Sequence, residues 1–394
     1  MSWPRLALAA LVIFAVNAVA TEPDWTVRVT PYDGIYPSLE LSQARRRTAL
    51  SPTDHTLGGG SGLVAVEVKS RRASESIALS MQIPDFDRPA RFAASLQDAD
   101  IDYSLHPPLD WNLPQLRTLT SPRSTRLTVA MTRDGHNAGT RNVDVTVHPL
   151  GEALYFVRDG RDSVDLSWIF AAYVDEHDPV VDSILDAAAA SEIVEPFAGY
   201  ANADPTAVYR QVWAVWHVLS ARSIRYSTID PAIERGPKVF SQRVRFLADT
   251  WNDRSANCID GSVLIASVLQ RIGIRTFLVL VPGHAFIGFY TDPDAQHAAY
   301  LETTLIGATV AMPTRKPDFA DDVTLTPENR KSLASFSAAL AAGRAHHLRV
   351  AGKLDGRHRP NYAVIDIAAA RAFGIRPIAE DDERLVIPAK AGIR

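Results

Sequence analysis

The sequence predicts an α+β protein of two domains, a β-sandwich followed by a domain that mixes helices with strands. The length of 394 residues favours more than one domain. From Trp25 to about Leu150, short runs alternate apolar with polar or small residues, which is typical of strands that bury one face. After about residue 150 the apolar residues recur at helical spacing, and only a few strand-like runs lie among them.

The first part of the chain, residues 21–160, is assigned to the β-sandwich-like domain. Asp134-Gly135 is a turn signal, and a proline-rich connection lies between about Tyr103 and Pro122. Short strands separated in this way are typical of a sandwich. Few polar groups here are arranged for chemistry, so we expect a scaffold or recognition role. Strands are expected at residues 62–69, 77–83, 126–131 and 142–147.

Residues 161–377 are assigned to the second domain. Asp178-Pro179 and Asp204-Pro205 each pair a helix N-cap with a proline at the first helical position. The second of these helices carries an apolar stripe that includes Trp213 and Trp216, which we interpret as core residues rather than ligand-binding ones. Further helices are expected at residues 241–252 and from Thr326 toward His346. A strand at residues 362–367 is then followed by a last, alanine-rich helix that ends at Phe373.

The first 20 residues have the layout of a secretory signal peptide. Arg5 precedes an apolar run from Leu6 to Val16, and Ala18-Val19-Ala20 supplies the small residues of a cleavage site. The apolar run is short for a membrane span, although an uncleaved anchor is the alternative. We therefore expect a mature chain that begins at Thr21 and a periplasmic or secreted location.

Composition excludes several classes of partner. The formal net charge is −4, and no basic block or basic amphipathic helix points to nucleic acid or to a membrane surface. Gly58-Gly59-Gly60 lacks the lysine and helix of a phosphate loop and is interpreted as a link. His346 and His347 are adjacent, so on a helix they diverge and cannot share one metal ion. We expect no cofactor and no metal, and residues 378–394 are interpreted as a peripheral tail.

Cys258 is the only cysteine, so it cannot form an internal disulfide. It is an inert buried thiol, an intermolecular bridge or a nucleophile. Asn257 is a good N-cap, and an apolar helical stripe follows it until Gly273 ends the helix. Cys258 therefore stands at the first turn, where the partial positive charge and unpaired N–H groups favour a thiolate and can hold an oxyanion.

The residues after this helix supply a candidate base and a candidate carboxylate. Strands are expected at residues 275–281, 284–290 and 300–304, with a turn near Pro293. A hairpin symmetric about that turn places His284 opposite Glu302 on the same face. Glu302 can then accept from one ring nitrogen and leave the other to meet Cys258, as in a nucleophile–base–orienter triad. Asp292 and Asp294 compete with Glu302 for the third role, although they lie in the turn.

These residues resemble the transglutaminase-like cysteine-enzyme superfamily, whose fold is related to that of papain. The resemblance covers about residues 205–310 and is clearest from Asn257 to Gly288, where the sequence is most like that of a bacterial branch of the superfamily. In that family a cysteine opens a helix with the pattern C-x-D, a histidine begins a later strand, and an acidic residue follows. Those positions are Cys258, Asp260, His284 and Glu302 here.

Two departures from the family pattern concern the site. The usual His-Ala-Trp is His284-Ala285-Phe286 here, and the usual aspartate is Glu302. For the oxyanion we expect the backbone N–H of Cys258, with Gln242 or Trp251 as candidates for a second donor. Asp260 is expected to stabilise the helix dipole rather than to take part in chemistry.

Together with the signal-peptide pattern, the resemblance implies an exported, cysteine-dependent acyl-transfer enzyme that acts on peptide or amide bonds of a peptide or protein substrate. Hydrolysis by a peptidase or amidase is favoured, because water is always present as an acceptor. A protein cross-linking transglutaminase and a non-catalytic binding module that retains the fold are the alternatives. The substrate and the oligomeric state stay open.

Overall fold

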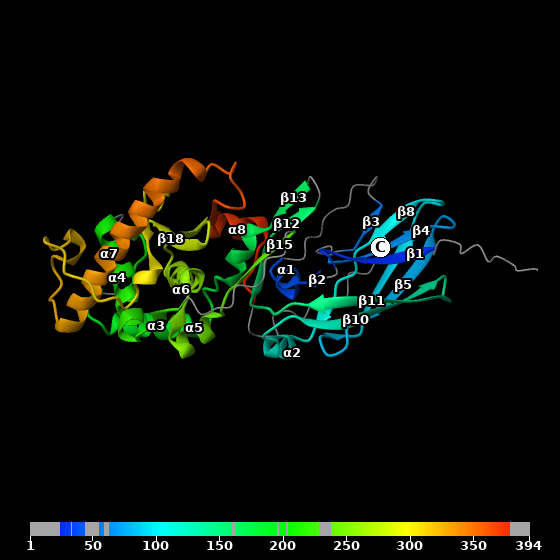
Figure 1. The fold of residues 1–394 in the computed structure, drawn as a ribbon, viewed down its shortest axis with the longest axis horizontal. Coiled ribbons are helices and arrows are strands. Elements are labelled where there is room, and N and C mark those ends of the chain that lie inside the picture. Colours follow the sequence, from blue (N-terminus) through cyan, green and yellow to red (C-terminus); the bar gives the residue numbers. More distant parts are fainter. Residues whose placement is uncertain are drawn as a thin grey trace, which may run out of the picture.

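The computed structural model describes residues 24–32, 34–43, 55–58, 63–159, 162–194, 197–201, 204–227 and 238–378. The predicted signal segment and nearly all of the predicted tail lie outside the described residues. The fold is a mixture of helices and strands in several sheets. The molecule is elongated, with strands gathered at one end and most helices at the other (Figure 1).

The amino-terminal strands form two principal sheets whose buried side chains belong to one hydrophobic core. Burial alternates strictly along Glu75–Gln82, as the period-2 pattern predicts. One sheet has the order β1-β4-β8-β3 and the other β2-β11-β10-β5-β7. The elements are β1 (Trp25–Val29), β2 (Gly34–Ile35), α1 (Pro37–Leu41), β3 (Thr56–Leu57), β4 (Val64–Lys69), β5 (Glu75–Gln82), β6 (Asp87–Arg88), β7 (Ala90–Leu96), β8 (Asp102–Leu105), β9 (Asp110–Trp111), α2 (Leu113–Thr118), β10 (Arg123–Arg133) and β11 (His136–Val147).

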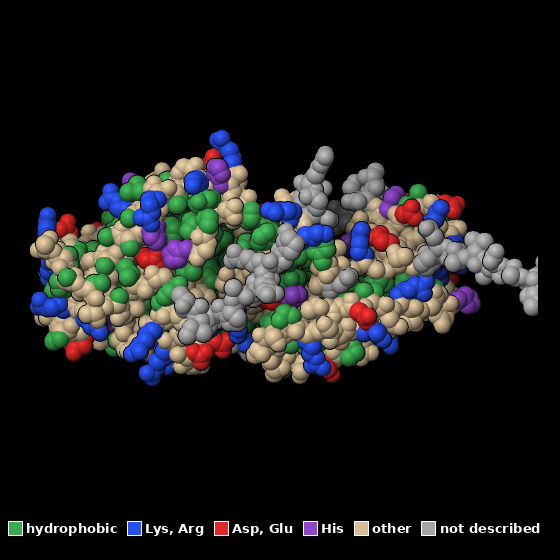
Figure 2. All heavy atoms as spheres, viewed as in Figure 1, with side chains coloured by type: hydrophobic (Ala, Val, Ile, Leu, Met, Phe, Trp, Pro, Cys, Tyr) green, Lys and Arg blue, Asp and Glu red, His purple; other side chains and the backbone are tan. Residues whose placement is uncertain are grey.

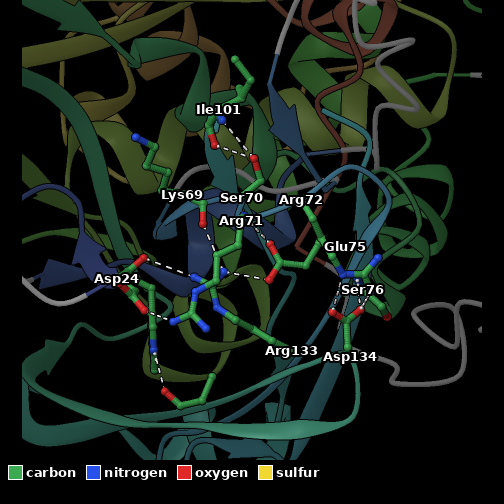
Figure 3. Close-up of polar contacts among 12 residues, drawn as sticks. Asp24, Lys69, Ser70, Arg71, Arg72, Glu75, Ser76, Ile101, Arg133 and Asp134 are labelled. Carbon is green, nitrogen blue, oxygen red and sulfur yellow. Dashed lines mark hydrogen bonds and ion pairs between the residues drawn. The ribbon is translucent and has the colours of Figure 1, made fainter. Parts of the chain in front are cut away.

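A buried ion pair joins the ends of strands in these sheets (Figure 3). Arg133 donates to Glu75 at 3.0 Å and to the carbonyl of Lys69 at 3.1 Å, and both charged side chains are almost fully buried. Glu75 also accepts from the backbone N–H of Arg71, whose guanidinium pairs with Asp24. Removing one member of such a pair leaves an uncompensated buried charge, which costs about 3–5 kcal/mol.

The second half of the chain has its own, larger core. Its strands are β12 (Glu152–Asp159), β13 (Asp162–Asp165), β14 (Arg225–Tyr226), β15 (Val239–Arg243), β16 (Ser255–Ala256), β17 (Thr276–Val281), β18 (His284–Tyr290), β19 (Ala298–Leu301) and β20 (Ala363–Asp366). Its helices are α3 (Pro179–Ala189), α4 (Pro205–Ala221), α5 (Leu247–Asp253), α6 (Cys258–Arg271), α7 (Pro327–Val350) and α8 (Ile367–Phe373), with 3-10 turns η1 (Ser167–Tyr173), η2 (Thr303–Leu305), η3 (Asp318–Ala320) and η4 (Ala351–Lys353).

One expected helix is wrong in its first half. The structure has a strand, β15, over Val239–Arg243, and the helix α5 begins only at Leu247. β15 pairs antiparallel with β12, so a partner distant in the sequence decides its conformation. Gln242 therefore lies on a strand and not on a helix.

A four-stranded antiparallel sheet of order β19-β18-β17-β20 supports the candidate site. Helix α6 packs against β17 and β18, and its buried stripe belongs to the main core. Phe277, Val279 and Phe286 form a smaller cluster of their own. Phe286, two residues after His284, is fully buried in it.

Helix α7 contacts the rest of this half near its first turns and again in its second half. Trp213 and Trp216 on α4 are fully buried, and their indole N–H groups donate to Ser332 and Ser335 on α7 at 3.1 and 2.9 Å. The tryptophans are core residues, as predicted. Further along α7, Gly343 lies against β19, where an added Cβ would come within 2.5 Å of the Tyr300 carbonyl oxygen. A glycine is therefore required for this close approach.

Candidate active site

Cys258 is the first residue of helix α6, as predicted from the cap. The Asn257 side chain accepts from the N–H groups of Ile259 and Asp260, both at 2.9 Å. The Asp260 carboxylate in turn accepts from the backbone N–H of Asn257 at 3.0 Å, which completes a capping box. None of these three bonds uses the N–H of Cys258, which is the donor expected to hold an oxyanion. The Cys258 side chain is half-buried at the edge of the main core.

His284 and Glu302 meet, although not in the predicted register. Ile287 pairs with Leu301 and Gly288 with Tyr300, so the hairpin is offset by two residues from the symmetric arrangement. An even offset leaves every side chain on the predicted face. Nε2 of His284 consequently reaches Oε2 of Glu302 at 2.7 Å.

His284 interacts with Cys258 as well as with Glu302. Because Nε2 is bonded to Glu302, Nδ1 is the nitrogen that remains for the thiol. Burial alone would lower the pKa of His284, but hydrogen bonds to Cys258 and Glu302 and their negative charges outweigh it and raise the pKa to about 10. These interactions stabilise the imidazolium form, which is the partner of a thiolate.

Glu302 is almost fully buried and held on both oxygens. Its Oε1 accepts from the N–H of Thr304 at 3.1 Å and from the Thr304 hydroxyl at 2.7 Å. Burial alone would raise the pKa of Glu302, but the bond from His284, the imidazolium charge and the Thr304 donors hold it below its usual value. The carboxylate is therefore ionised and fixed in orientation.

Close packing brings Glu302 and the first turn of α6 together. The next residue, Thr303, donates to the carbonyl of Cys258 at 3.1 Å. An added Cβ at Gly261 would come within 3.1 Å of the Thr303 side chain, so a small residue is needed there. The thiol and the carboxylate are thus linked through the backbone as well as through the histidine.

The structure adds His346 to the site. Its Nδ1 lies 3.0 Å from Oε2 of Glu302, the same oxygen that His284 contacts, and its ring lies edge-on to that of His284 with centroids 5.4 Å apart. Burial lowers the pKa of His346 despite the neighbouring carboxylate. The neighbouring His347 instead stacks on Tyr300. Adjacency in the sequence shows only that His346 and His347 diverge, and it does not predict the group that His346 forms with His284 and Glu302.

Tyr226 is a second residue that the sequence argument missed. β14 pairs parallel with β16, which places Tyr226 beside Ala256, two residues before Cys258. Burial, followed by the charges of Cys258 and Glu302, raises the pKa of Tyr226. Its side chain is 44% exposed, so the hydroxyl can face a ligand. A tyrosine on a strand next to a helix start has no local sequence signal that would single it out.

The predicted oxyanion candidates are engaged elsewhere. The side-chain amide of Gln242 donates to the carbonyl of Arg243 at 2.9 Å. The ring of Trp251 lies under the guanidinium of Arg222 at 4.4 Å. Neither contact involves the Cys258–His284 pair, and both assignments stay predictions.

The other acidic residues have structural tasks. Asp260 is buried, and besides its part in the capping box it accepts from the N–H of Arg245 at 2.9 Å. Asp292 accepts from the N–H groups of Gln296 and His297 within the turn. Glu302, rather than Asp292, is thus the carboxylate that contacts His284.

Figure 2 shows histidine side chains beside an acidic group on the surface of the half that carries α7 and β18. The ligand atoms of His284, Glu302 and His346 lie within 4.8 Å of one another, so these residues can hold a metal ion. The arrangement can therefore support either proton transfer at a thiol or coordination of a cation.

Comparisons with known proteins add little to this geometry. No family model matches the chain, and no curated protein is significantly similar to it. A solved structure of a proposed cysteine protease from Cytophaga hutchinsonii is 12% identical over 61% of this chain and 75% of that chain, with a TM-score of 0.23. A likeness this slight carries no argument. Within the described residues, no helix is both long and apolar enough to cross a membrane.

Proposed function

We propose that this protein is an exported cysteine-dependent acyl-transfer enzyme that cleaves peptide or amide bonds. In this proposal residues 21–160 form a β-sandwich and residues 161–377 a transglutaminase-like, papain-related domain. Cys258 is the nucleophile, His284 the general acid and base, and Glu302 the orienting carboxylate. The observation that carries the proposal is the His284 ring, whose Nε2 is hydrogen-bonded to Glu302 and whose pKa is raised by its interactions with both Glu302 and Cys258.

In the first half of the proposed reaction, the Cys258 thiolate attacks the amide carbonyl carbon, and the carbonyl electron pair moves onto oxygen. We assign stabilisation of this oxyanion to the N–H of Cys258 and to the hydroxyl of Tyr226. The intermediate collapses, the C–N bond breaks, and the Nδ1 proton of His284 passes to the departing amine. A thioester and a neutral imidazole remain.

In the second half, a water molecule attacks the thioester carbonyl while Nδ1 of His284 accepts its proton. Collapse breaks the C–S bond, releases a carboxylic acid and restores the thiolate–imidazolium pair. Glu302 keeps Nε2 protonated and the ring aligned throughout. An amine in place of water would give transamidation by the same steps.

The location outside the cytoplasm rests on the sequence of residues 1–20. A chain with a single cysteine cannot form an internal disulfide in an oxidising compartment, so its thiol stays available for chemistry. No membrane association is proposed beyond the signal segment.

The direct test is formation of an acyl-enzyme. The full mature chain is mixed with p-nitrophenyl acetate, and intact mass spectrometry follows acetylation of Cys258 while absorbance follows turnover. We expect rapid acetylation and turnover in the wild type, loss of both in Cys258→Ser, and slow acetylation in His284→Ala. His297→Ala, which changes an exposed histidine in the turn, is the matched control.

The outcomes separate the alternatives. Equal, slow acetylation of wild type and His284→Ala would support the non-catalytic binding module instead. Acetylation followed by transfer to an added primary amine in preference to water would identify a cross-linking enzyme.

A further inference from the structure

We propose that His284, Glu302 and His346 bind a borderline divalent cation such as Zn²⁺, and that the bound ion switches off the Cys258–His284 pair. The ligand atoms lie within 4.8 Å of one another and come from β18, from the residue after β19 and from α7. Cation binding stands on this geometry alone, whereas its regulatory effect rests on the proposed function.

The donor set selects the ion. Two imidazole nitrogens and one carboxylate oxygen form the three-ligand set that zinc proteins use when a fourth position stays open. Imidazole favours Zn²⁺, Cu²⁺, Ni²⁺ and Fe²⁺, whereas Ca²⁺ and Mg²⁺ prefer oxygen ligands. The site should therefore discriminate against the abundant hard cations.

Two of the three ligand distances need only a small adjustment, and the third, between the two imidazole nitrogens, lies within 4.8 Å. Ligands bound tetrahedrally at about 2.0–2.1 Å from Zn²⁺ lie about 3.3 Å apart. Nε2 of His284 and Nδ1 of His346 are now 2.7 and 3.0 Å from the same Glu302 oxygen. Each histidine must therefore withdraw from the carboxylate by a few tenths of an ångström, and both side chains are partly exposed, which leaves room to do so.

The surroundings support coordination. Thr304 holds the second oxygen of Glu302 through its N–H and its hydroxyl, the kind of outer-sphere bonding that orients metal-bound carboxylates. The backbone N–H of Glu302 donates to the carbonyl of Ala339 at 3.1 Å, which fastens the ligand directly to α7. The side chains of His284 and His346 are 22% and 30% exposed, so an ion can reach them from solvent.

A bound ion would stop turnover for a specific reason. It takes the lone pair of Nε2, and the proton there is released to solvent. The ring proton is then on Nδ1, facing Cys258. Deacylation needs a free lone pair on Nδ1 to accept a proton from water, and the protonated Nδ1 cannot supply it. Glu302 also becomes a metal ligand instead of the partner of an N–H group.

Binding is tested on the chelator-treated full chain with Co²⁺ as a spectroscopic probe and with Zn²⁺ by calorimetry. We expect one ion per chain, with visible Co²⁺ absorption of four- or five-coordinate intensity that Zn²⁺ abolishes. His346→Ala and Glu302→Gln should each weaken binding by more than the about 10–100-fold that loss of an outer-sphere partner costs. Near-UV circular dichroism verifies that each variant is folded.

Two controls separate this site from simple chelation by the thiol. Cys258→Ser should bind Co²⁺ as the wild type does and show no sulfur-to-cobalt charge-transfer band. His347→Ala, which changes the adjacent histidine that stacks on Tyr300, should also bind normally. The proposal is overturned if the wild type binds no ion at micromolar concentration, if His346→Ala binds as tightly, or if Cys258→Ser loses the ion.

The regulatory effect has its own measurement. Zn²⁺ should inhibit p-nitrophenyl acetate turnover by the wild type at the concentration that saturates the Co²⁺-defined site, and should inhibit His346→Ala only at far higher concentration. A chain that binds Co²⁺ but never turns over ester would overturn the proposed function and leave the cation site standing. A chain that turns over ester but binds no ion would do the reverse.

Discussion

Replacement of Glu302 by glutamine tests whether the buried carboxylate activates the thiol. Four donors converge on its two oxygens: His284, His346 and two groups of Thr304. An amide of the same shape has only one acceptor oxygen, so donors on one side must lose their partner. A hydrogen bond between charged groups is worth about 1.5–3 kcal/mol. Since 1.4 kcal/mol corresponds to tenfold, alkylation of Cys258 should slow about ten- to a hundredfold.

The assay is the second-order rate of iodoacetamide labelling, followed by intact mass at about pH 6, where an ordinary thiol is almost wholly protonated. The imidazolium of His284 persists up to about pH 10 in the wild type, because its pKa is raised to that value. Without the carboxylate charge this pKa falls, so the alkaline limit of amide cleavage, in which His284 gives its proton to the departing amine, should move to lower pH. Asp292→Asn is the matched control. Equal labelling of wild type and Glu302→Gln, or an equal loss in Asp292→Asn, would refute the assignment.

Three further outcomes are expected. Tyr226→Phe should lower ester turnover about 10²–10³-fold if its hydroxyl stabilises the oxyanion, while alkylation of Cys258 stays unchanged; an unaltered kcat would exclude that role. Gly343→Ala places a Cβ against the Tyr300 carbonyl, so α7 must move away, and urea unfolding should show a loss of about 1–3 kcal/mol. Burial raises the pKa of Asp87 to about 7. The folded state therefore retains a proton that the unfolded chain loses above about pH 4, and wild-type stability should fall from pH 4 to 7. Asp87→Asn should abolish that fall in urea titrations; an undiminished fall would assign it to other groups.

Local signals were sufficient for the elements that carry the proposed chemistry. An N-cap asparagine before an apolar stripe fixes where α6 starts, and that alone places Cys258 at a helix terminus. The strand tip at His284 follows from the break at Pro282-Gly283. The return strand, expected at residues 300–304, ends at Leu301, and Glu302 caps the turn η2. The register was wrong by two residues, yet side chains alternate with a period of two, so their shared face was predicted correctly.

Long-range packing decided what local signals could not. The strand β15 was mistaken for a helix because its pairing with β12 is invisible from residues 239–243 alone. His346 reaches Glu302 only because α7 is fixed against α4 by the Trp213 and Trp216 contacts and against β19 at Gly343. None of these contacts leaves a pattern near residue 346. Sequence spacing therefore named Cys258, His284 and Glu302 and could not name His346.

The contacts between α7 and Glu302 have a consequence for biosynthesis. Cys258, His284 and Glu302 are all made before the helix that contributes the Ala339 carbonyl and the second imidazole. A nascent or truncated chain that ends before this segment holds the thiol without its fully assembled carboxylate. In the proposed enzyme, full activation of the sulfur would therefore await synthesis of α7.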